Sequence, residues 1–304
     1  MSYTELYISS DPNISFNVKG KKASLRIVGV PFDYTSCFRP GSRFAPNAIR
    51  TAFQNIEIFS HRLGVDMENS TIEDLGNIRQ TANIEQMIES VAKVTGELVN
   101  DKIPIAILGG EHSITYGSFG IFLDSKSAKN STGLVIFDAH LDLRKEFSGL
   151  ELSHATFLRQ LIERRGLNAL DVFHIGTRAA SSEEWKLAKQ LGINILAAHQ
   201  AHDVARGSEQ LREFAEKHEQ IYVSIDLDGM DPAFVPAVGT PEPFGLTPEE
   251  VLNYIYALRG AKIPVFDIVE LAVPYDNGTT AAVAAKLLNE TACLASLRED
   301  RKAL

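Results

Sequence analysis

Carboxylates and histidines stand close together in several segments of this chain, in combinations that suit a divalent cation. The segment DAHLD supplies Asp138, His140 and Asp142 at alternate positions. Alternate side chains of an extended segment point the same way, so these three are expected to converge on one point. Two carboxylates and an imidazole suit a divalent cation of intermediate hardness. The segment therefore predicts a metal site in preference to a capped strand end with a satisfied histidine.

Two further segments add ligands of the same kinds. DLDGMDP repeats the alternate spacing with Asp226 and Asp228, and GGEHS offers the imidazole of His112 behind a pair of glycines. Two adjacent carboxylates that point the same way repel each other strongly unless a cation lies between them. Two histidines and four aspartates suffice for two metal ions with shared carboxylates. An oxygen-rich set without cysteine favours manganese over structural zinc.

Apolar runs must position these segments. GGEHS follows the run at 103–108, DAHLD follows 134–137, DLDGMDP follows 221–225, and Glu270 follows 265–269. Similar runs cover 25–30, 172–175 and 193–196. Continuous hydrophobicity is typical of parallel strands that are buried on both faces. Open parallel sheets bind ligands at the carboxyl ends of their strands, so four such clusters predict one site at that edge.

Helical patterns alternate with these runs. They cover residues 85–99, 208–217 and 280–297, and capping boxes at 181–184 and 247–250 begin two more helices. This alternation predicts an α/β fold, with a parallel sheet between layers of helices. There is no internal repeat, linker or shift in composition, so residues 1–304 are expected to form a single domain.

Composition excludes several classes of protein. The chain has 304 residues, and 30 Lys and Arg against 39 Asp and Glu give a formal net charge of −9. An acidic chain without a basic run is a poor partner for nucleic acid. Two cysteines, a polar first twenty residues and the lack of a long apolar run predict a cytoplasmic protein without a membrane partner. The nucleotide-binding glycine motifs and the G-x-S-x-G nucleophile motif are absent.

The ordered set of segments resembles the manganese ureohydrolases of the arginase–agmatinase family. The segments are residues 29–50, GGEHS, DAHLDL, SIDLDGMDPAFVPAVGTPEPFGLT and DIVELAVPYD, which together cover most of the chain. The resemblance implies an eight-stranded parallel sheet in a three-layer α/β/α sandwich. It also implies two Mn²⁺ ions per subunit and a homo-oligomer, either a trimer or a hexamer.

The resemblance also implies which residues hold the metals. One ion would be bound by His112, Asp138, Asp142 and Asp226, and the other by Asp138, His140, Asp226 and Asp228, so that Asp138 and Asp226 bridge. Water shared by two divalent cations loses a proton near neutral pH and becomes a nucleophile. Asp142 would orient it by a hydrogen bond.

Three more residues match active-site positions of the family. Glu270 resembles the glutamate that binds the guanidinium group, whose N–H fork a carboxylate meets bidentately. His154, in ELSHATFLRQL, resembles the histidine that passes a proton to the leaving amine. Thr240, in GTPE, resembles a residue of the substrate-side loop. A turn acid, a helix-terminal histidine and a Pro–Gly turn are the respective alternatives.

The segment 143–153 is expected to set substrate preference. It lacks the Asn- and Ser-rich loop of arginases, and its Glu146 and Glu151 would repel a carboxylate and attract an amine. A small cationic guanidino substrate, agmatine, is therefore expected to be hydrolysed to putrescine and urea. Arg39, Arg43 or Arg144 would reverse this preference by reaching the pocket. Arginine, guanidinobutyrate, aminopropylagmatine and formimidoylglutamate stay open as substrates, as do a one-metal zinc deacetylase-like enzyme and a non-catalytic relative.

Overall fold

A nine-stranded sheet forms the centre of the protein, in the order β1-β5-β2-β6-β11-β10-β7-β8-β9. The computed structural model describes residues 2–9, 14–16, 18–19, 21–124 and 131–297. The strands of the sheet are β1 (Ile8–Ser9), β2 (Ala23–Gly29), β5 (Thr71–Ile78), β6 (Ile105–Leu108), β7 (Thr132–Phe137), β8 (Val172–Ile175), β9 (Asn194–Leu196), β10 (Gln220–Asp226) and β11 (Val265–Val269). Eight of them run parallel, and the two-residue β1 pairs antiparallel with β5 at the edge.

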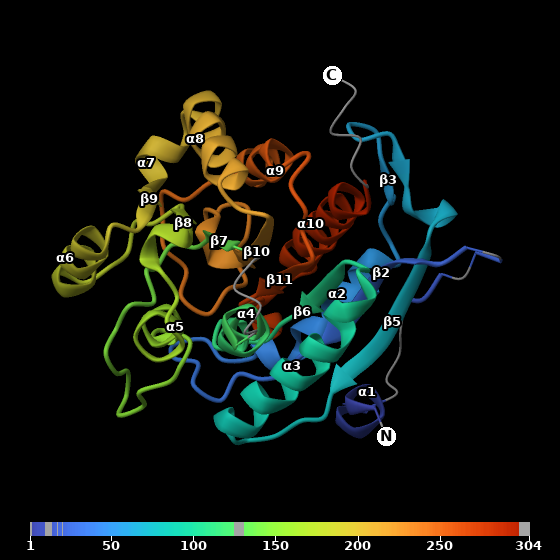
Figure 1. The fold of residues 1–304 in the computed structure, drawn as a ribbon, viewed down its shortest axis with the longest axis horizontal. Coiled ribbons are helices and arrows are strands. Elements are labelled where there is room, and N and C mark those ends of the chain that lie inside the picture. The colour runs from blue at the N-terminus through green and yellow to red at the C-terminus, as the bar shows by residue number, and fades with distance from the viewer. Residues whose placement is uncertain (1, 10–13, 17, 20, 125–130, 298–304) are drawn as a thin grey trace.

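Helices cover both faces of this sheet, as Figure 1 shows. The helices are α1 (Tyr3–Tyr7), α2 (Ala45–Phe53), α3 (Ile84–Leu98), α4 (Ile114–Asp124), α5 (Phe157–Arg165), α6 (Ser182–Leu191), α7 (Ala198–Ala201), α8 (Val204–Glu216), α9 (Pro248–Ala257) and α10 (Thr279–Ser296). One apolar cluster packs α2, α8, α9 and α10 against one face, and a second packs α3, α4, α5 and α6 against the other. The predicted three-layer α/β/α sandwich is therefore confirmed.

Smaller elements complete the chain. A hairpin of β3 (Phe59–Ser60) and β4 (Val65–Asp66) lies outside the main sheet. Single turns of 3-10 helix occur at Ser42–Phe44, Met67–Asn69, Val99–Asp101, Ala169–Asp171, Leu227–Gly229 and Val273–Tyr275. Among the described residues, no helix combines the length and the apolar character needed to cross a membrane.

All seven apolar runs form strands, but β5 was missed in the sequence. Its residues TIEDLGNI include a buried charge, Asp74, whose carboxylate accepts hydrogen bonds from Nε and Nη2 of Arg50 at 2.7 and 2.8 Å. A buried ion pair lets a polar segment lie inside a parallel sheet, and the pairing partner comes from α2 and not from the segment itself. Both predicted capping boxes are present, with Ser181 and Thr247 accepting from the amides of Glu184 and Glu250.

The order of the sheet gathers the four motif-bearing strands. β6, β11, β10 and β7 are consecutive neighbours in the middle of the sheet, and all four run parallel. Their carboxyl ends therefore lie side by side, although the chain visits them far apart in sequence. This arrangement places GGEHS, DAHLD, DLDGMDP and Glu270 around a single location.

Candidate metal centre and active site

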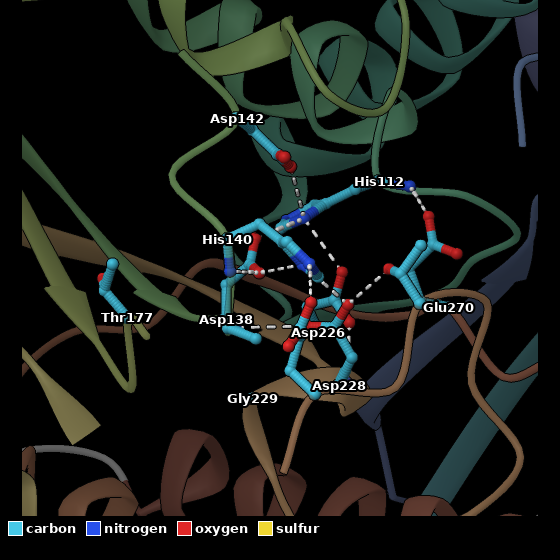
Figure 2. A network of polar contacts seen from close by, with 12 residues as sticks. His112, Asp138, His140, Asp142, Thr177, Asp226, Asp228, Gly229 and Glu270 are labelled. Carbon is cyan, nitrogen blue, oxygen red and sulfur yellow. Dashed lines mark hydrogen bonds and ion pairs between the residues drawn. The ribbon is translucent and has the colours of Figure 1, made fainter. Parts of the chain in front are cut away.

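The imidazole of His112 faces three carboxylates. Its Nδ1 lies 3.1 Å from Oδ2 of Asp138, 3.3 Å from Oδ2 of Asp142 and 3.1 Å from Oδ2 of Asp226. These four side chains come from three separate segments and turn toward a common point (Figure 2). The predicted ligand set of the first metal ion is thus brought together.

A second imidazole lies beside the first group. Nδ1 of His140 is 3.0 Å from Oδ2 of Asp228 and 3.5 Å from Oδ1 of Asp138. Asp138 consequently faces both histidines with its two oxygens, as a bridging ligand would. Asp226 contacts His112 through Oδ2, while its Oδ1 accepts the backbone N–H of Asp228 at 2.8 Å. Its bridging role stays a prediction.

The residues present fit a divalent cation. Nδ1 of His112 and Oδ2 of Asp138 are buried, face each other, and have no hydrogen-bond partner among the described residues. Burial, followed by the charges of Asp228 and Asp138, raises the pKa of Asp226 well above its usual range. Burial, followed by the charge of Asp138, raises the pKa of Asp142 to about 7. A cation between these carboxylates would remove both the unpaired atoms and the repulsion.

The backbone places Asp142 in a way that alternate spacing does not describe. β7 ends at Phe137, and Asp142 adopts a left-handed conformation with φ of 50°. The three polar residues of DAHLD do converge, as predicted, but not because the segment stays extended. A bend in the backbone returns Asp142 to the centre. Glu270 also has positive φ, at 69°. Such conformations are costly for residues other than glycine, and they gather at functional sites.

A chain of buried hydroxyl groups supports His112 from behind. Nε2 of His112 lies 2.9 Å from Oγ of Ser224, which donates to Oδ1 of Asp267 at 2.6 Å. Thr115 and Tyr222 donate to the other oxygen of Asp267 at 2.8 and 2.5 Å. Because Ser224 gives its proton to the carboxylate, Nε2 of His112 is the donor and Nδ1 is left free to bind metal. An aspartate inside the apolar run VFDIV was the unused sequence signal for this support.

On the opposite side of the metal centre, Arg178, which follows β8, holds the chain by hydrogen bonds to backbone carbonyls. Its guanidinium donates to the carbonyls of Asp228 (2.7 Å), Gly229 (3.0 Å), Met230 (3.1 Å), Glu242 (2.7 Å), Pro243 (3.0 Å) and Gly176 (3.2 Å). One side chain thus ties the segment that carries the ligand Asp228 to the loop beyond Thr240. Thr240 itself donates to Oδ2 of Asp228 at 3.0 Å.

A cavity of about 400 Å³ opens onto the metal centre. Glu270, His154 and Thr240 all line it, as predicted from the sequence. Glu270 is buried, and its Oε1 accepts the backbone N–H of His112 at 2.7 Å. Burial, followed by the charges of His140 and His112, lowers the pKa of His154 to about 4. His154 precedes α5, whose N-cap is Thr156, so it is not a helix-terminal residue.

The mouth of the cavity differs from the prediction. Glu146 and Glu151 are exposed and are not among the described residues that line the cavity, and Glu151 pairs with Arg164 instead. Their expected repulsion of a substrate carboxylate is therefore wrong, because the loop turns them to solvent. Arg144, Glu184 and Glu242 line the mouth in their place.

Several lining residues had no assigned role in the sequence. Cys37 and Phe147 reach the cavity from loops, and Ser181 and Glu184 reach it from the start of α6. The capping box at 181–184 predicted that helix end but not its place in the site. Residues 29–50 were noted for their family likeness and for Arg39 and Arg43, but not for Thr35, which this stretch brings against His154.

Fold and site together define a class: an α/β protein with a candidate divalent-metal centre at the carboxyl edge of a parallel sheet. Residues 23–293 match the arginase family. An agmatinase of Bacillus cereus is 33% identical over 92% of each chain, and a guanidinobutyrase of Pseudomonas aeruginosa is 30% identical over 88% of this chain and 85% of its own. The crystal structure of the agmatine ureohydrolase of Thermoplasma volcanium superposes with a TM-score of 0.81 at 35% identity, covering 90% of both chains.

The chain belongs to the arginase family. It is a ureohydrolase, an enzyme that hydrolyses guanidino compounds, and its His and Asp cluster is the metal-binding site.

Proposed function

We propose that this enzyme hydrolyses agmatine to putrescine and urea with two Mn²⁺ ions. The observation that carries the proposal is one cavity that contains both imidazole–carboxylate groups and the buried carboxylate of Glu270. A guanidinium group held by such a carboxylate lies next to a centre that is able to activate water. The likeness to agmatinases over nine-tenths of the chain supports the choice of substrate.

Each residue has a distinct part in this reaction. When bound, a pair of divalent cations makes water a competent nucleophile near neutral pH. Glu270 accepts N–H groups of the guanidinium and orients its carbon, while Asp142 orients the attacking oxygen. A carbon–oxygen bond forms and the bond from carbon to the alkyl nitrogen breaks. His154, neutral before the reaction, takes up at Nε2 the proton that the attacking water loses and passes it to that nitrogen, which leaves as an amine.

The charges at the mouth bear on the tail of the substrate. Both oxygens of Glu184 accept hydrogen bonds from its own helix start and from the amide of Leu143. Glu242 is the freer carboxylate, with its Oε1 3.9 Å from Nε2 of His140. A carboxylate of this kind attracts the terminal ammonium of agmatine.

A guanidino acid is the second candidate, and Arg144 favours it. This side chain lines the cavity, lies over the ring of Phe147, and stays 3.8 Å from Glu184. Its guanidinium therefore keeps donors for a substrate carboxylate, which it would meet in a bidentate pair. The likeness to a guanidinobutyrase agrees with this alternative.

Urea release decides between the candidates. The enzyme is loaded with Mn²⁺ and its kcat/KM is measured for agmatine, arginine, guanidinobutyrate, guanidinopropionate, aminopropylagmatine and formimidoylglutamate. An unpaired, partly desolvated charge costs several kcal/mol, so the right tail should be favoured by about 10²-fold. A higher value for guanidinobutyrate would replace agmatine as the substrate and leave the ureohydrolase assignment intact.

Two matched variants locate the cause of the preference. Glu242→Gln should lower kcat/KM for agmatine more than for guanidinobutyrate, because it removes the carboxylate that attracts the ammonium. Arg144→Gln should do the reverse. The same panel repeated with Zn²⁺ tests the choice of metal, and activity with Zn²⁺ alone at one ion per chain would contradict a pair of manganese ions.

A further inference from the structure

Glu111 of the GGEHS segment is a buried carboxylate that the mechanism above does not use. Its side chain is fully buried, and four donors surround it. Oε1 accepts from Oγ1 of Thr35 at 2.5 Å and from Oγ of Ser113 at 2.6 Å, while Oε2 accepts from the backbone N–H of Thr35 at 2.7 Å and from Oγ of Ser36 at 3.4 Å. A carboxylate that meets four donors serves as an acceptor at every one of them.

The hydroxyl group of Thr35 connects this carboxylate to His154. Oγ1 of Thr35 lies 3.1 Å from Nδ1 of His154, and it also accepts the backbone N–H of His154 at 3.1 Å. The hydroxyl has one proton, and that proton points to Glu111. Toward His154 the oxygen offers only lone pairs, so Nδ1 of the imidazole must be the donor.

We propose that Glu111, acting through Thr35, is a positioning residue that holds His154 in the tautomer with its proton on Nδ1. Nε2 then carries the free lone pair. The proposal rests on the catalytic role given to His154 under the proposed function.

Geometry at Nε2 agrees with this tautomer. Nε2 of His154 lies 3.7 Å from Sγ of Cys37, and both residues line the cavity. A thiol is a weak donor, so it leaves the lone pair of Nε2 available to a stronger one. The edge of the imidazole that exchanges a proton with the reactants is thus the edge that Thr35 does not contact.

The relay also supports the charged form of His154. When Nε2 takes up a proton, Nδ1–H still donates to Thr35, whose hydroxyl still donates to the carboxylate of Glu111. A positive imidazolium is then connected to a negative carboxylate through one hydroxyl, which resembles the arrangement in Ser-His-Asp triads. Loss of the relay should slow proton transfer and therefore lower kcat more than it changes KM.

A purely structural role for Glu111 is the competing explanation. The backbone N–H of Glu111 donates to the carbonyl of Phe32 at 2.8 Å, and its carboxylate caps the amide of Thr35, so the residue also holds this loop in place. A structural role would affect folding and metal content. It would not determine which nitrogen of His154 carries the proton.

Glu111→Gln gives the sharpest test because it reverses the proton order. The glutamine oxygen is required by the backbone N–H of Thr35, so its NH₂ group faces Oγ1 of Thr35. That hydroxyl then accepts from the amide and is free to donate to Nδ1 of His154. The proton of His154 should consequently move from Nδ1 to Nε2.

Nitrogen-15 NMR of the histidine side chains reads the tautomer directly in the full protein. The enzyme is loaded with Zn²⁺ because the d¹⁰ ion is diamagnetic, and His154→Asn assigns the His154 signals by their disappearance. Wild type and Thr35→Ser should show Nδ1–H, Glu111→Gln should show Nε2–H, and Thr35→Val should lose the preference. An Nε2–H signal in wild type, or an unchanged Nδ1–H signal in Glu111→Gln, would overturn the proposal.

Kinetics with Mn²⁺ form the second readout. Thr35→Val and Glu111→Gln should lower kcat by roughly 10- to 100-fold, a part of what a general acid–base group contributes, with KM changed far less. Thr35→Ser should restore kcat. An equal loss in Thr35→Ser and Thr35→Val would point to loop packing and refute the relay. If wild type releases urea from no substrate of the panel, the proposed function fails while the tautomer measurement still judges the relay.

Discussion

The two sides of the metal centre are supported in different ways. On one side, the His112 side chain is 1% exposed and is fixed by side chains, through Ser224 to the buried carboxylate of Asp267. On the other, the His140 side chain is 26% exposed and faces the cavity. Its partner Asp228 is held at several points: Oδ1 accepts the backbone N–H of Ala139 at 3.1 Å, Oδ2 accepts the hydroxyl of Thr240, and its backbone carbonyl accepts from Arg178.

This difference predicts how each side responds to mutation. A hydrogen-bonded chain of single hydroxyls fixes one imidazole tautomer, so the loss of one member leaves a buried polar group without a partner. The Arg178 guanidinium donates to six carbonyls, so the loss of any one hydrogen bond leaves five in place. The His112 side should therefore be sensitive to small chemical changes, and the Asp228 side should respond gradually.

Asp138→Asn should have the largest effect because it removes the ligand that both sides share. Asp138 is the residue whose oxygens face His112 and His140 at 3.1 and 3.5 Å. We expect metal binding to weaken on both sides and urea release to fall below detection. Metal analysis and kinetics of the purified variant check this. A variant that retains the wild-type metal content and turnover would show that Asp138 does not bridge.

Asp267→Asn should break the His112 side selectively. An amide in place of the carboxylate disturbs the order of donors from Ser224 to His112, and loss of such outer partners typically weakens metal binding by about 10- to 100-fold. Titration of the metal-free protein with Mn²⁺ measures the change. Tyr222→Phe is the matched control, because it removes one hydrogen bond to the same aspartate on its other oxygen. Equal losses in both variants would assign the effect to the stability of the core.

Much of this comparison was visible in the sequence because buried parallel strands leave continuous apolar runs. The ligands at the ends of β7 and β10 were grouped correctly, since residues two to four apart in a short segment stay close in space. The position of His112 beside them followed from the expected common edge of parallel strands. The role of Asp267 was not predicted. An acid inside an apolar run indicates that the carboxylate has a buried hydrogen-bond partner, but not which residue that partner is.

Other features depend on tertiary structure that local patterns do not contain. The strand β5 contains Asp74, and its partner Arg50 lies 24 residues earlier in the chain. Exposure of Glu146 depends on which way a long loop turns, and the sequence is compatible with either direction. Arg178 was missed because its partners are backbone carbonyls, which every residue possesses.

Arg178→Lys sharpens the comparison from the other side. An ammonium group replaces a planar fork and makes fewer of the six hydrogen bonds, so the Asp228 segment and the Thr240 loop should loosen together. We expect kcat/KM to fall by about 10-fold, since small displacements of positioning groups are costly. Mn²⁺ binding should change less than in Asp267→Asn. A larger loss of metal binding than in Asp267→Asn would contradict the assignment of the two supports.

The smallest expected effect is on stability and concerns His174 on β8, next to the Arg178 segment. His174 is buried, its Nδ1 lies 2.7 Å from Oγ1 of Thr177, and its Nε2 has no hydrogen-bond partner among the described residues. Burial is the main cause that lowers the pKa of His174 to about 4. The unfolded chain therefore binds a proton at His174 near pH 6.5, whereas the folded chain binds it only near pH 4.

The sign of the pH dependence follows from this difference. Above about pH 6.5 both states are neutral at His174 and its contribution is complete, and as the pH falls the unfolded state gains protons and stability is lost until about pH 4. The loss at about pH 5 should be about 2 kcal/mol. Denaturant unfolding of metal-free wild type and His174→Gln between about pH 7.5 and 5 isolates this residue, because the other histidines and the metal ligands contribute to both proteins alike. The variant should lose less stability over this range, and parallel curves would show that folding does not lower the pKa of His174.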